Sequence, residues 1–272
     1  MNKEDYLINK ISSNYVGDDG AVIGNRVYSM DAFCENVHFR REWMSLSQIA
    51  RKAILVNISD AVAMNAKPLY ALISLSLPKD INLEEIDEIV ESLHKVAKEY
   101  DCEIIGGDTI AGERLDFSIT IISETDNALT RKGLQEGDLL AYTGILGDSK
   151  KDLNRLFRGE KISSNSKFIE PILRKEFIAK SRKYLKTGMD ISDGLFCDTN
   201  KMLKMNNIGF ELLKEISDEV GSSGEEYEML VGFSAKYIKD IEKIAKETNT
   251  PLTIFAKISN NRLSFDCLNH HF

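Results

Sequence analysis

The sequence has few of the residues that hold small secreted proteins together or build common zinc sites. Its 272 residues include four cysteines, four prolines and one tryptophan. The cysteines lie far apart and form no CxxC pair, which argues against a zinc knuckle and against a small disulfide framework. We therefore expect reduced thiols at all four positions, which are Cys34, Cys102, Cys197 and Cys267.

The sequence also lacks the segments that direct a protein into a membrane or out of the cell. No stretch approaches the roughly 20 apolar residues that a membrane-spanning helix needs. The N-terminus, MNKEDYLINKISSNYVGDD, carries acidic residues and no apolar segment like that of a signal peptide. These absences predict a cytoplasmic protein with no membrane partner.

Basic residues are in deficit. The chain has 35 Lys and Arg against 43 Asp and Glu, a formal net charge of −8, and no Lys/Arg-rich run. Such a surface repels DNA and RNA, so we expect no nucleic-acid partner. Common nucleotide and hydrolase signatures are missing too, because the chain contains no GxxxxGK[ST], GxGxxG, HRD with a downstream DFG, HExxH or GxSxG.

The chain is long enough for two domains and apolar enough to fill their cores. At roughly 150 residues per domain, 272 residues with 43% apolar side chains admit both. Residue patterns in the first half predict strands over 26–33, 69–77, 103–105 and 115–123, a helix within 45–65 capped by Ser45, and a helix from the Asn82 cap. In the second half they predict strands over 139–143 and 252–257, helices from about 148, from Pro171 and from Ser192, and a helix over 234–247. We place the domain boundary near 133–137, which gives domains of 1–135 and 136–272.

Aspartates at the ends of predicted elements, several beside glycine, are the feature that indicates chemistry. They occur in the strings GDDG (17–20), SMD (29–31), SD (59–60), GDT (107–109) and DISDG (190–194). Each string alone has a structural explanation, such as an Asp-Gly turn, a tight glycine turn, or an N-cap at Ser192 flanked by carboxylates. Five such strings in one chain favour a site for a hard cation such as Mg²⁺, which binds clustered carboxylates.

Asp60 is the most informative of these aspartates. At about 100° per residue it falls within about 20° of Ile49, on the apolar stripe of its predicted helix, so the fold should bury it. A buried, ionised aspartate is costly unless it is paired or bound to metal. A metal ligand is therefore favoured over a structurally paired carboxylate.

The motifs together resemble a known family. In chain order they are GDDGAV (17–22), SMDAFCENVHF (29–39), KAILVNISDAVAMNAKP (52–68), IIGGDT (104–109), LTRKG (129–133), GDSKKDL (147–153), MDISDGL (189–195) and GEEYEML (224–230). They resemble thiamine-monophosphate kinases over almost the whole chain. The resemblance implies the fold shared with aminoimidazole ribonucleotide synthetase, in which an α+β N-terminal domain with a dimerising sheet precedes an α/β C-terminal domain. It also implies a homodimer.

The resemblance assigns roles to individual residues. It implies Mg²⁺ ligands at Asp19, Asp31, Asp60, Asp108, Asp190 and Asp193, with Ser29 as a possible further one. Contacts to the co-substrate ATP are implied for Gly107, Asp108, Arg131 and Ser192, and contacts to thiamine monophosphate for His38 and Glu225. Of these residues, Asp60, Asp108, Arg131 and Asp193 would serve catalysis.

The sequence departs from the family pattern at three places. Met30 stands where the family usually has Thr, which removes a potential oxygen ligand. Residues 223–226 read SGEE instead of GGED, and the tail reads NHHF (269–272) instead of an aromatic residue before DHF. Phe272 is the candidate replacement for the aromatic contact to substrate.

The implied reaction transfers the γ-phosphoryl group of ATP to the phosphate of thiamine monophosphate and yields thiamine diphosphate and ADP. Metal ions and Arg131 would screen the repulsion between the two anionic reactants. Three alternatives stay open. They are a ligase-type synthetase of the same superfamily, a metal-dependent phosphohydrolase, and a non-catalytic nucleotide-binding relative.

Overall fold

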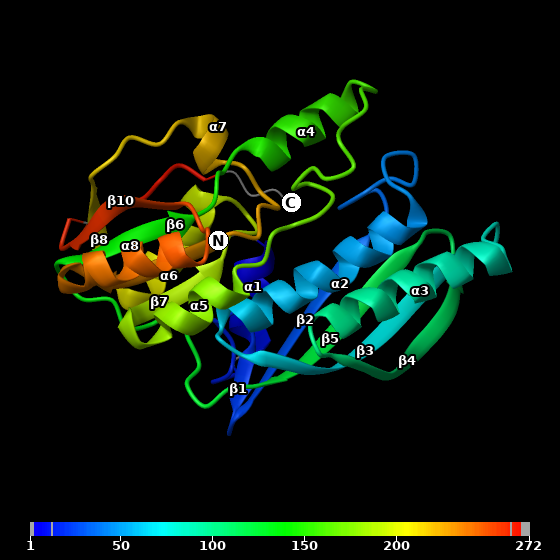
Figure 1. Ribbon diagram of the computed structural model, residues 1–272, viewed down its shortest axis with the longest axis horizontal. Coiled ribbons are helices and arrows are strands. Elements are labelled where there is room, and N and C mark those ends of the chain that lie inside the picture. Colours follow the sequence, from blue (N-terminus) through cyan, green and yellow to red (C-terminus); the bar gives the residue numbers. More distant parts are fainter. Residues whose placement is uncertain (1–2, 12, 262, 268–272) are drawn as a thin grey trace.

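The computed structural model of the protein describes residues 3–11, 13–261 and 263–267, and the chain forms two five-stranded sheets side by side (Figure 1). The first sheet has the strand order β1-β2-β5-β3-β4 and the second the order β7-β9-β6-β10-β8. The first sheet ends at Glu124 and the second begins at Asp138. The predicted boundary falls in the segment between them and stays a prediction.

The first half contains the following elements: α1 (Lys3–Ile11), β1 (Ala21–Ile23), β2 (Arg26–Cys34), α2 (Leu46–Ala63), β3 (Lys67–Pro78), α3 (Leu83–Glu99), β4 (Glu103–Gly112) and β5 (Asp116–Glu124). Strands β3 and β4 pair in parallel, and the other neighbours are antiparallel. Helices α2 and α3 pack together over one face of this sheet (Figure 1). Capping boxes fix both helix starts, since Ser45 and Asn82 exchange hydrogen bonds with Gln48 and Glu85, which confirms the two predicted caps.

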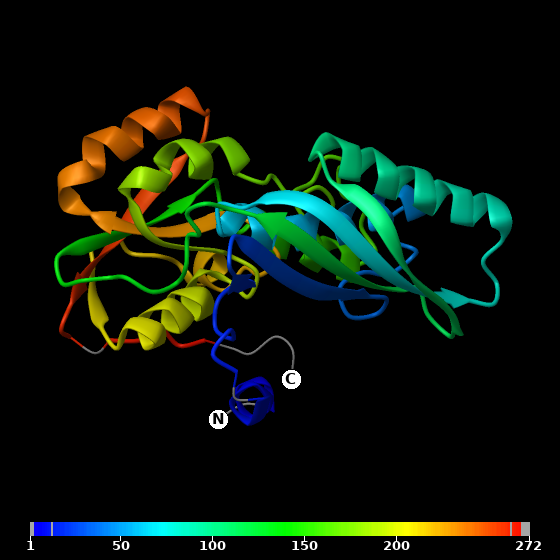
Figure 2. The same ribbon diagram turned by 90° about the horizontal axis from the view of Figure 1, so that it is seen from below.

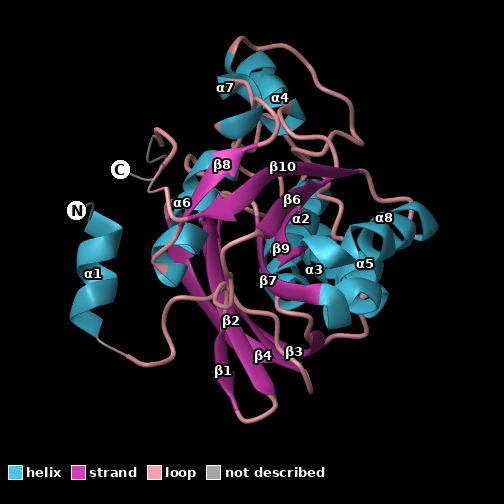
Figure 3. Cartoon of the chain, turned by 90° about the vertical axis from the view of Figure 1, so that its left-hand side faces the viewer, coloured by secondary structure: helices cyan, strands magenta, loops and turns pink. Residues whose placement is uncertain are grey.

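The second half contains these elements: β6 (Asp138–Thr143), α4 (Asp148–Phe157), α5 (Lys175–Ser181), β7 (Leu185–Asp190), α6 (Leu195–Asn206), β8 (Gly209–Leu212), α7 (Asp218–Gly221), β9 (Met229–Ser234), α8 (Ile238–Glu247) and β10 (Leu252–Ser259). All strand pairs of this sheet are antiparallel. Figure 2 shows α5 and α8 on one face of the sheet and α6 on the other, and Figure 3 shows the same layers end-on. No helix in the described part of the chain is long and apolar enough to cross a membrane.

Several predicted boundaries were wrong. The strand predicted over 103–105 continues to Gly112, through two glycines at positive φ. Gly107 is needed there, because a Cβ atom would lie 1.7 Å from the carbonyl oxygen of Ile73 on β3. The helix predicted from Pro171 begins at Lys175, and the helix over 234–247 begins at Ile238 after a short 3₁₀ turn.

The start of α6 also differs from the prediction. Gly194, with φ of 98°, precedes its first residue, Leu195, so Ser192 is not the N-cap. The physical reason is that residues 191 and 192 belong to a loop that pairs with residues 225–227. Their carbonyl oxygens accept hydrogen bonds from the N–H groups of Tyr227 and Glu225, at 2.9 Å and 2.7 Å.

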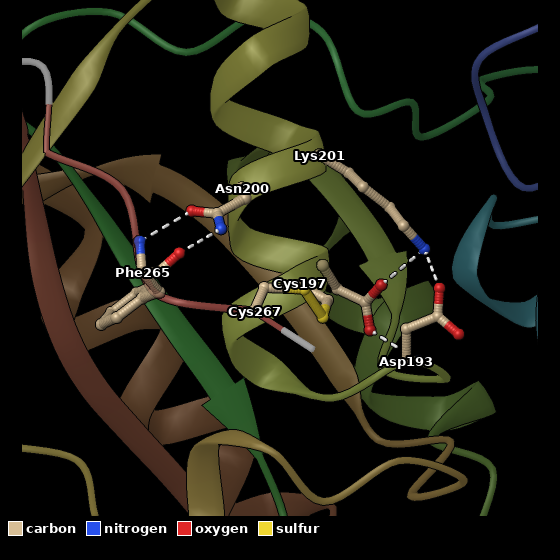
Figure 4. Close-up of a disulfide and its surroundings, with 7 residues drawn as sticks. Asp193, Cys197, Asn200, Lys201, Phe265 and Cys267 are labelled. Atoms are coloured by element: carbon tan, nitrogen blue, oxygen red, sulfur yellow. Dashed lines mark hydrogen bonds and ion pairs between the residues drawn. A yellow bond between two sulfur atoms is a disulfide. The ribbon is translucent and has the colours of Figure 1, made fainter. Parts of the chain in front are cut away.

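The expectation of four reduced thiols was wrong for two of them. Cys197 and Cys267 form a disulfide across 70 residues, with their Cα atoms 5.2 Å apart (Figure 4). The tail is held beside α6 by packing, because the Phe265 ring stacks on Phe196 at 4.3 Å. Asn200 adds two hydrogen bonds to the Phe265 backbone. Sequence spacing could not show this proximity. Cys34 and Cys102 are free thiols.

Candidate active site

The structure brings three of the predicted metal ligands together where the two halves of the chain meet. Asp19, Asp60 and Asp190 each offer a carboxylate oxygen, and these oxygens lie within 4.8 Å of one another. Asp19 lies in the loop before β1, Asp60 in the last turn of α2, and Asp190 at the end of β7. The site therefore depends on the packing of both halves.

Burial and mutual repulsion dominate the electrostatics of this aspartate cluster. Asp60 and Asp190 are 8% and 3% exposed. Burial raises the pKa of both carboxyl groups well above the ordinary value, and the charges of neighbouring aspartates raise the pKa further. Ser59 partly offsets this at Asp190, because its hydroxyl donates a 2.6 Å hydrogen bond to the carboxylate. Without a cation, the cluster therefore favours bound protons.

Two buried oxygens at this site have no hydrogen-bond partner among the described residues. They are Oδ2 of Asp19 and Oγ of Ser29. Buried polar atoms in folded proteins are nearly always satisfied, so unpaired acceptors beside a carboxylate cluster indicate a missing ligand. Oxygen donors of this kind are those that Mg²⁺ binds. The residues present therefore fit a divalent cation.

Asp31 lies beside the cluster on β2. Its charge contributes to the raised pKa of Asp60 and of Asp190. Its backbone N–H donates a 2.8 Å hydrogen bond to Oδ1 of Asn57 on α2. This bond fixes the strand to the helix that carries Asp60. Met30 belongs to the opposite face of the strand and is 64% exposed, so its side chain points away from the aspartate cluster of its own chain, and the expectation that it removes a ligand oxygen stays a prediction.

Arg131 is held against the cluster by two aspartates. Its guanidinium forms an ion pair with Asp19, and its backbone N–H donates a 2.6 Å hydrogen bond to Oδ1 of Asp18. Burial alone would lower the pKa of Arg131, but the charge of Asp19 and its hydrogen bond raise it above the ordinary value. The Asp18-Asp19 pair thus orients the Arg131 guanidinium beside the aspartate cluster.

Asp193 lies on the loop after β7, outside the group of three aspartates. Its carboxylate forms an ion pair with Lys201, which also contacts Asp198 at 3.0 Å (Figure 4). Burial raises the pKa of Asp198 to about 6. The sequence analysis missed Asp198 and Lys201. Their three-residue spacing on α6 was a signal that could have found them.

Gly107 and Asp108 do not reach the cluster within one chain. Gly107 lies in the same row of the first sheet as Asp31, but β5 and β3 stand between them. Three strand spacings correspond to about 14 Å. Asp108 falls in the next row, with Ser74 on β3, and is exposed. Strand alternation places that row on the sheet face opposite α2.

His38 and Glu225 are connected by a series of side-chain contacts that runs through Phe33 and Lys52. The His38 ring stacks on Phe33 at 5.4 Å, and its Nδ1 accepts a 2.9 Å hydrogen bond from the Cys34 N–H. The Phe33 ring lies 5.7 Å from Nζ of Lys52, which pairs with Oε2 of Glu225 at 2.5 Å. Lys52 was missed because an isolated helical lysine is normally a surface residue.

Ser192 and Phe272 are the two remaining predicted contacts. Ser192 lies on the loop between Asp190 and Asp193, with its carbonyl oxygen bound to the Glu225 N–H. Phe272 lies outside the described residues.

Comparisons with known proteins agree on one group of relatives. Residues 17–125 match the family model of the AIR synthase related protein, N-terminal domain. A thiamine-monophosphate kinase from Leptospira interrogans is 32% identical over 79% of this chain and 76% of its own length. One from Aquifex aeolicus is 29% identical over 82% of this chain and 77% of its own length.

Solved structures agree with the sequence comparisons. A structure described as AaThiL complexed with AMPPCP and TMP has a TM-score of 0.83 and 25% identity, covering 96% of this chain and 91% of that one. Hydrogenase maturation protein HypE from E. coli shares the fold, with a TM-score of 0.73, 15% identity and 98% of each chain covered. These likenesses confirm the predicted fold class.

Proposed function

Because the chain belongs to the thiamine-monophosphate kinase family, we propose that it transfers the γ-phosphoryl group of ATP to the phosphate of thiamine monophosphate. The products are thiamine diphosphate and ADP. The observation that best supports this reaction is the group of Asp19, Asp60 and Asp190, which lies beside an oriented arginine and includes a buried oxygen of Asp19 with no hydrogen-bond partner among the described residues.

Asp19, Asp60 and Asp190 would hold Mg²⁺, with Asp31 and the hydroxyl of Ser29 beside them. When bound, the metal supplies positive charge that neutralises phosphate oxygens during transfer. Arg131 adds a fixed cation, because Asp18 and Asp19 hold both its backbone and its guanidinium. Asp193 would be a further ligand after exchanging Lys201 for the metal.

The acceptor needs no dedicated general base. A phosphate monoester has its second pKa near 6, so at pH 7 it is largely the dianion and already nucleophilic. The role of the protein is to bring two anions into line and to stabilise the charge on the transferring group. On the acceptor side, His38 and Glu225 would bind the thiamine part, and Gly107, Asp108, Arg131 and Ser192 would contact ATP.

The enzyme would act as a homodimer joined through the first sheet. The face opposite α2 and α3 exposes apolar side chains from β2 and β3, namely Tyr28, Met30, Tyr70 and Leu72. A second copy would cover this face, since large exposed apolar patches mark interaction surfaces. Asp108 lies in a row of the same face and does not reach the aspartates of its own chain, so we propose that it serves the partner's site across the twofold contact.

Detection of ADP with and without thiamine monophosphate tests the proposed function. We expect ADP formation that depends on both the acceptor and Mg²⁺. ADP formation with no dependence on the acceptor would indicate a phosphohydrolase, and nucleotide binding without turnover would indicate a non-catalytic relative. Turnover that requires a different acceptor would indicate a synthetase of the same superfamily.

A further inference from the structure

Helix α2 makes several polar contacts with the second half of the chain, such as the ion pair of Arg51 with Glu170, and two of these contacts lie at the site. Ser59 donates to Asp190 at 2.6 Å, and Lys52 donates to Glu225 at 2.5 Å. The two donors are seven residues apart, which is about two helical turns, so they lie on the same side of α2 and about 10 Å apart. One helix face therefore contacts both the aspartate cluster and the glutamate assigned to the acceptor.

The surroundings of Lys52 are unusual for a lysine. The side chain is 0% exposed, and its ammonium lies 3.9 Å from the centre of the Phe168 ring and 5.7 Å from that of Phe33. Burial lowers the pKa of Lys52, while the charge of Glu225 opposes this effect. An uncompensated ammonium is costly in such a place, so the position requires its carboxylate partner.

Glu225 is constrained from both sides. Its backbone has φ of 54°, a left-handed conformation that is rare for a residue with a side chain, and its N–H donates to Ser192 at 2.7 Å. Lys52 holds Oε2. The side chain is 24% exposed, and no described residue donates a hydrogen bond to the other carboxylate oxygen. Glu225 thus presents a single open acceptor atom at a fixed place.

We propose that Lys52 is a positioning residue for acceptor binding: it fixes Glu225 so that Oε1 accepts a hydrogen bond from an N–H group on the heterocycle of the acceptor. This role rests on the proposed function. Lys52 also neutralises the carboxylate, so the pair recognises a hydrogen-bond donor and not simply a positive charge. Because Ser59 lies on the same helix face, α2 sets the separation between this contact and the metal-binding aspartates.

The test compares Lys52→Met with wild-type protein and with Lys243→Met, a matched change at a lysine that is 76% exposed on α8. Steady-state rates give KM for thiamine monophosphate and kcat, and titration with a fluorescent ATP analogue gives nucleotide affinity. We expect Lys52→Met to raise KM for the acceptor about ten- to a hundredfold, which corresponds to loss of one charge-assisted hydrogen bond. Nucleotide affinity should stay within about twofold of wild type, as in Lys243→Met.

Two further variants separate positioning from a purely structural role. Glu225→Gln alone should raise the same KM, and the double variant with Lys52→Met should be no worse than the more affected single variant, because the two side chains act as one unit. Lys52→Arg keeps the charge and should retain a lower KM than Lys52→Met. If Lys52→Met does not fold, the comparison of Lys52→Arg with Glu225→Gln decides the question.

The possible results are distinct. An unchanged KM in Lys52→Met, additive effects in the double variant, or equal losses of kcat, acceptor binding and nucleotide binding would each overturn the positioning role and leave the proposed function intact. Wild-type protein that forms no ADP in response to thiamine monophosphate would overturn the proposed function, and with it the role of Lys52 toward that acceptor.

Discussion

Ser59 and Asp190, 131 residues apart in the chain, are joined by a 2.6 Å hydrogen bond between buried atoms. Ser59 precedes Asp60 on α2, and Asp190 ends β7 of the second sheet. The bond therefore ties the helix that carries one aspartate of the cluster to the strand that carries another. It explains how two carboxylates that repel each other can be held at a separation that suits a shared cation.

Asp60→Asn should abolish phosphoryl transfer and leave the fold intact. The amide keeps the shape of the side chain but removes a charge that would bind metal, so we expect turnover to fall by at least about a hundredfold. Because Asp60 is buried among other carboxylates, its neutralisation should not lower the melting temperature in EDTA. Turnover assays and thermal melts measure both effects. Asp87→Asn, at an exposed position on α3, is the control, and turnover near the wild-type rate in Asp60→Asn would exclude Asp60 as a ligand.

Binding of Mg²⁺ should release protons, and its apparent affinity should rise with pH. Burial and neighbouring charges raise the pKa of Asp60 and of Asp190, so below those raised values the carboxyl groups carry protons that the metal must displace. Isothermal titration calorimetry in two buffers of different ionisation enthalpy measures the proton release. Identical heats in both buffers, with an affinity that does not change between pH 6 and 8, would contradict this prediction.

The sequence predicted α2 and α3 well because their signals are local. Each helix has a capping box and an apolar stripe within a single segment. Strands β7 and β9 escaped prediction because nearly all of their residues are buried, although β7 is at the edge of the second sheet. A buried strand does not alternate between apolar and polar residues, so it lacks the period that identifies a strand.

The residues of the candidate site also divide into those with a local sequence signal and those that depend on contacts between distant parts of the chain. Asp60 could be predicted because its own helix places it among apolar residues. The role of Lys52 could not be predicted, because it depends on a contact with Glu225, which is 173 residues away in the chain. The distance of Asp108 from the cluster was also hidden, because it follows from the order of the strands in the sheet and not from the motif around it.

Arg174→Met should destabilise the protein strongly. Arg174 makes two 2.7 Å hydrogen bonds to Glu228, which is 0% exposed; Glu228 is also paired with Lys167 at 3.3 Å and accepts a 2.7 Å hydrogen bond from the Thr143 hydroxyl. Removing one partner of a buried ion pair costs about 3–5 kcal/mol. The expected result is a fall in melting temperature of roughly 10 °C, measured by circular dichroism. Adding Glu228→Gln should recover part of the loss, and no recovery would argue that Arg174 acts through packing alone.

Cys197→Ser should lower stability in the absence of reductant. The disulfide to Cys267 closes a loop of about 70 residues, for which the chain-entropy model gives roughly 4 kcal/mol. Cys34→Ser, at a free thiol, is the control. Thermal melts with and without a small-molecule dithiol measure the effect, because the dithiol should lower the melting temperature of wild type and of Cys34→Ser but not of Cys197→Ser. Equal melting temperatures for wild type under both conditions would show that the bond does not stabilise the fold.

Asp108 should act in the site of the partner protomer. Asp60→Asn and Asp108→Asn proteins should each be inactive, and light scattering should give twice the mass of one chain for both. Mixing the two variants under conditions that exchange subunits should restore activity. A random mixture contains half heterodimers, and each heterodimer has one intact site in two, so about a quarter of wild-type activity is expected. If Asp108 acts in its own chain, every site in every heterodimer carries one defect and mixing restores nothing. A monomer in solution, or a dimeric mixture without recovered activity, would therefore contradict the shared site.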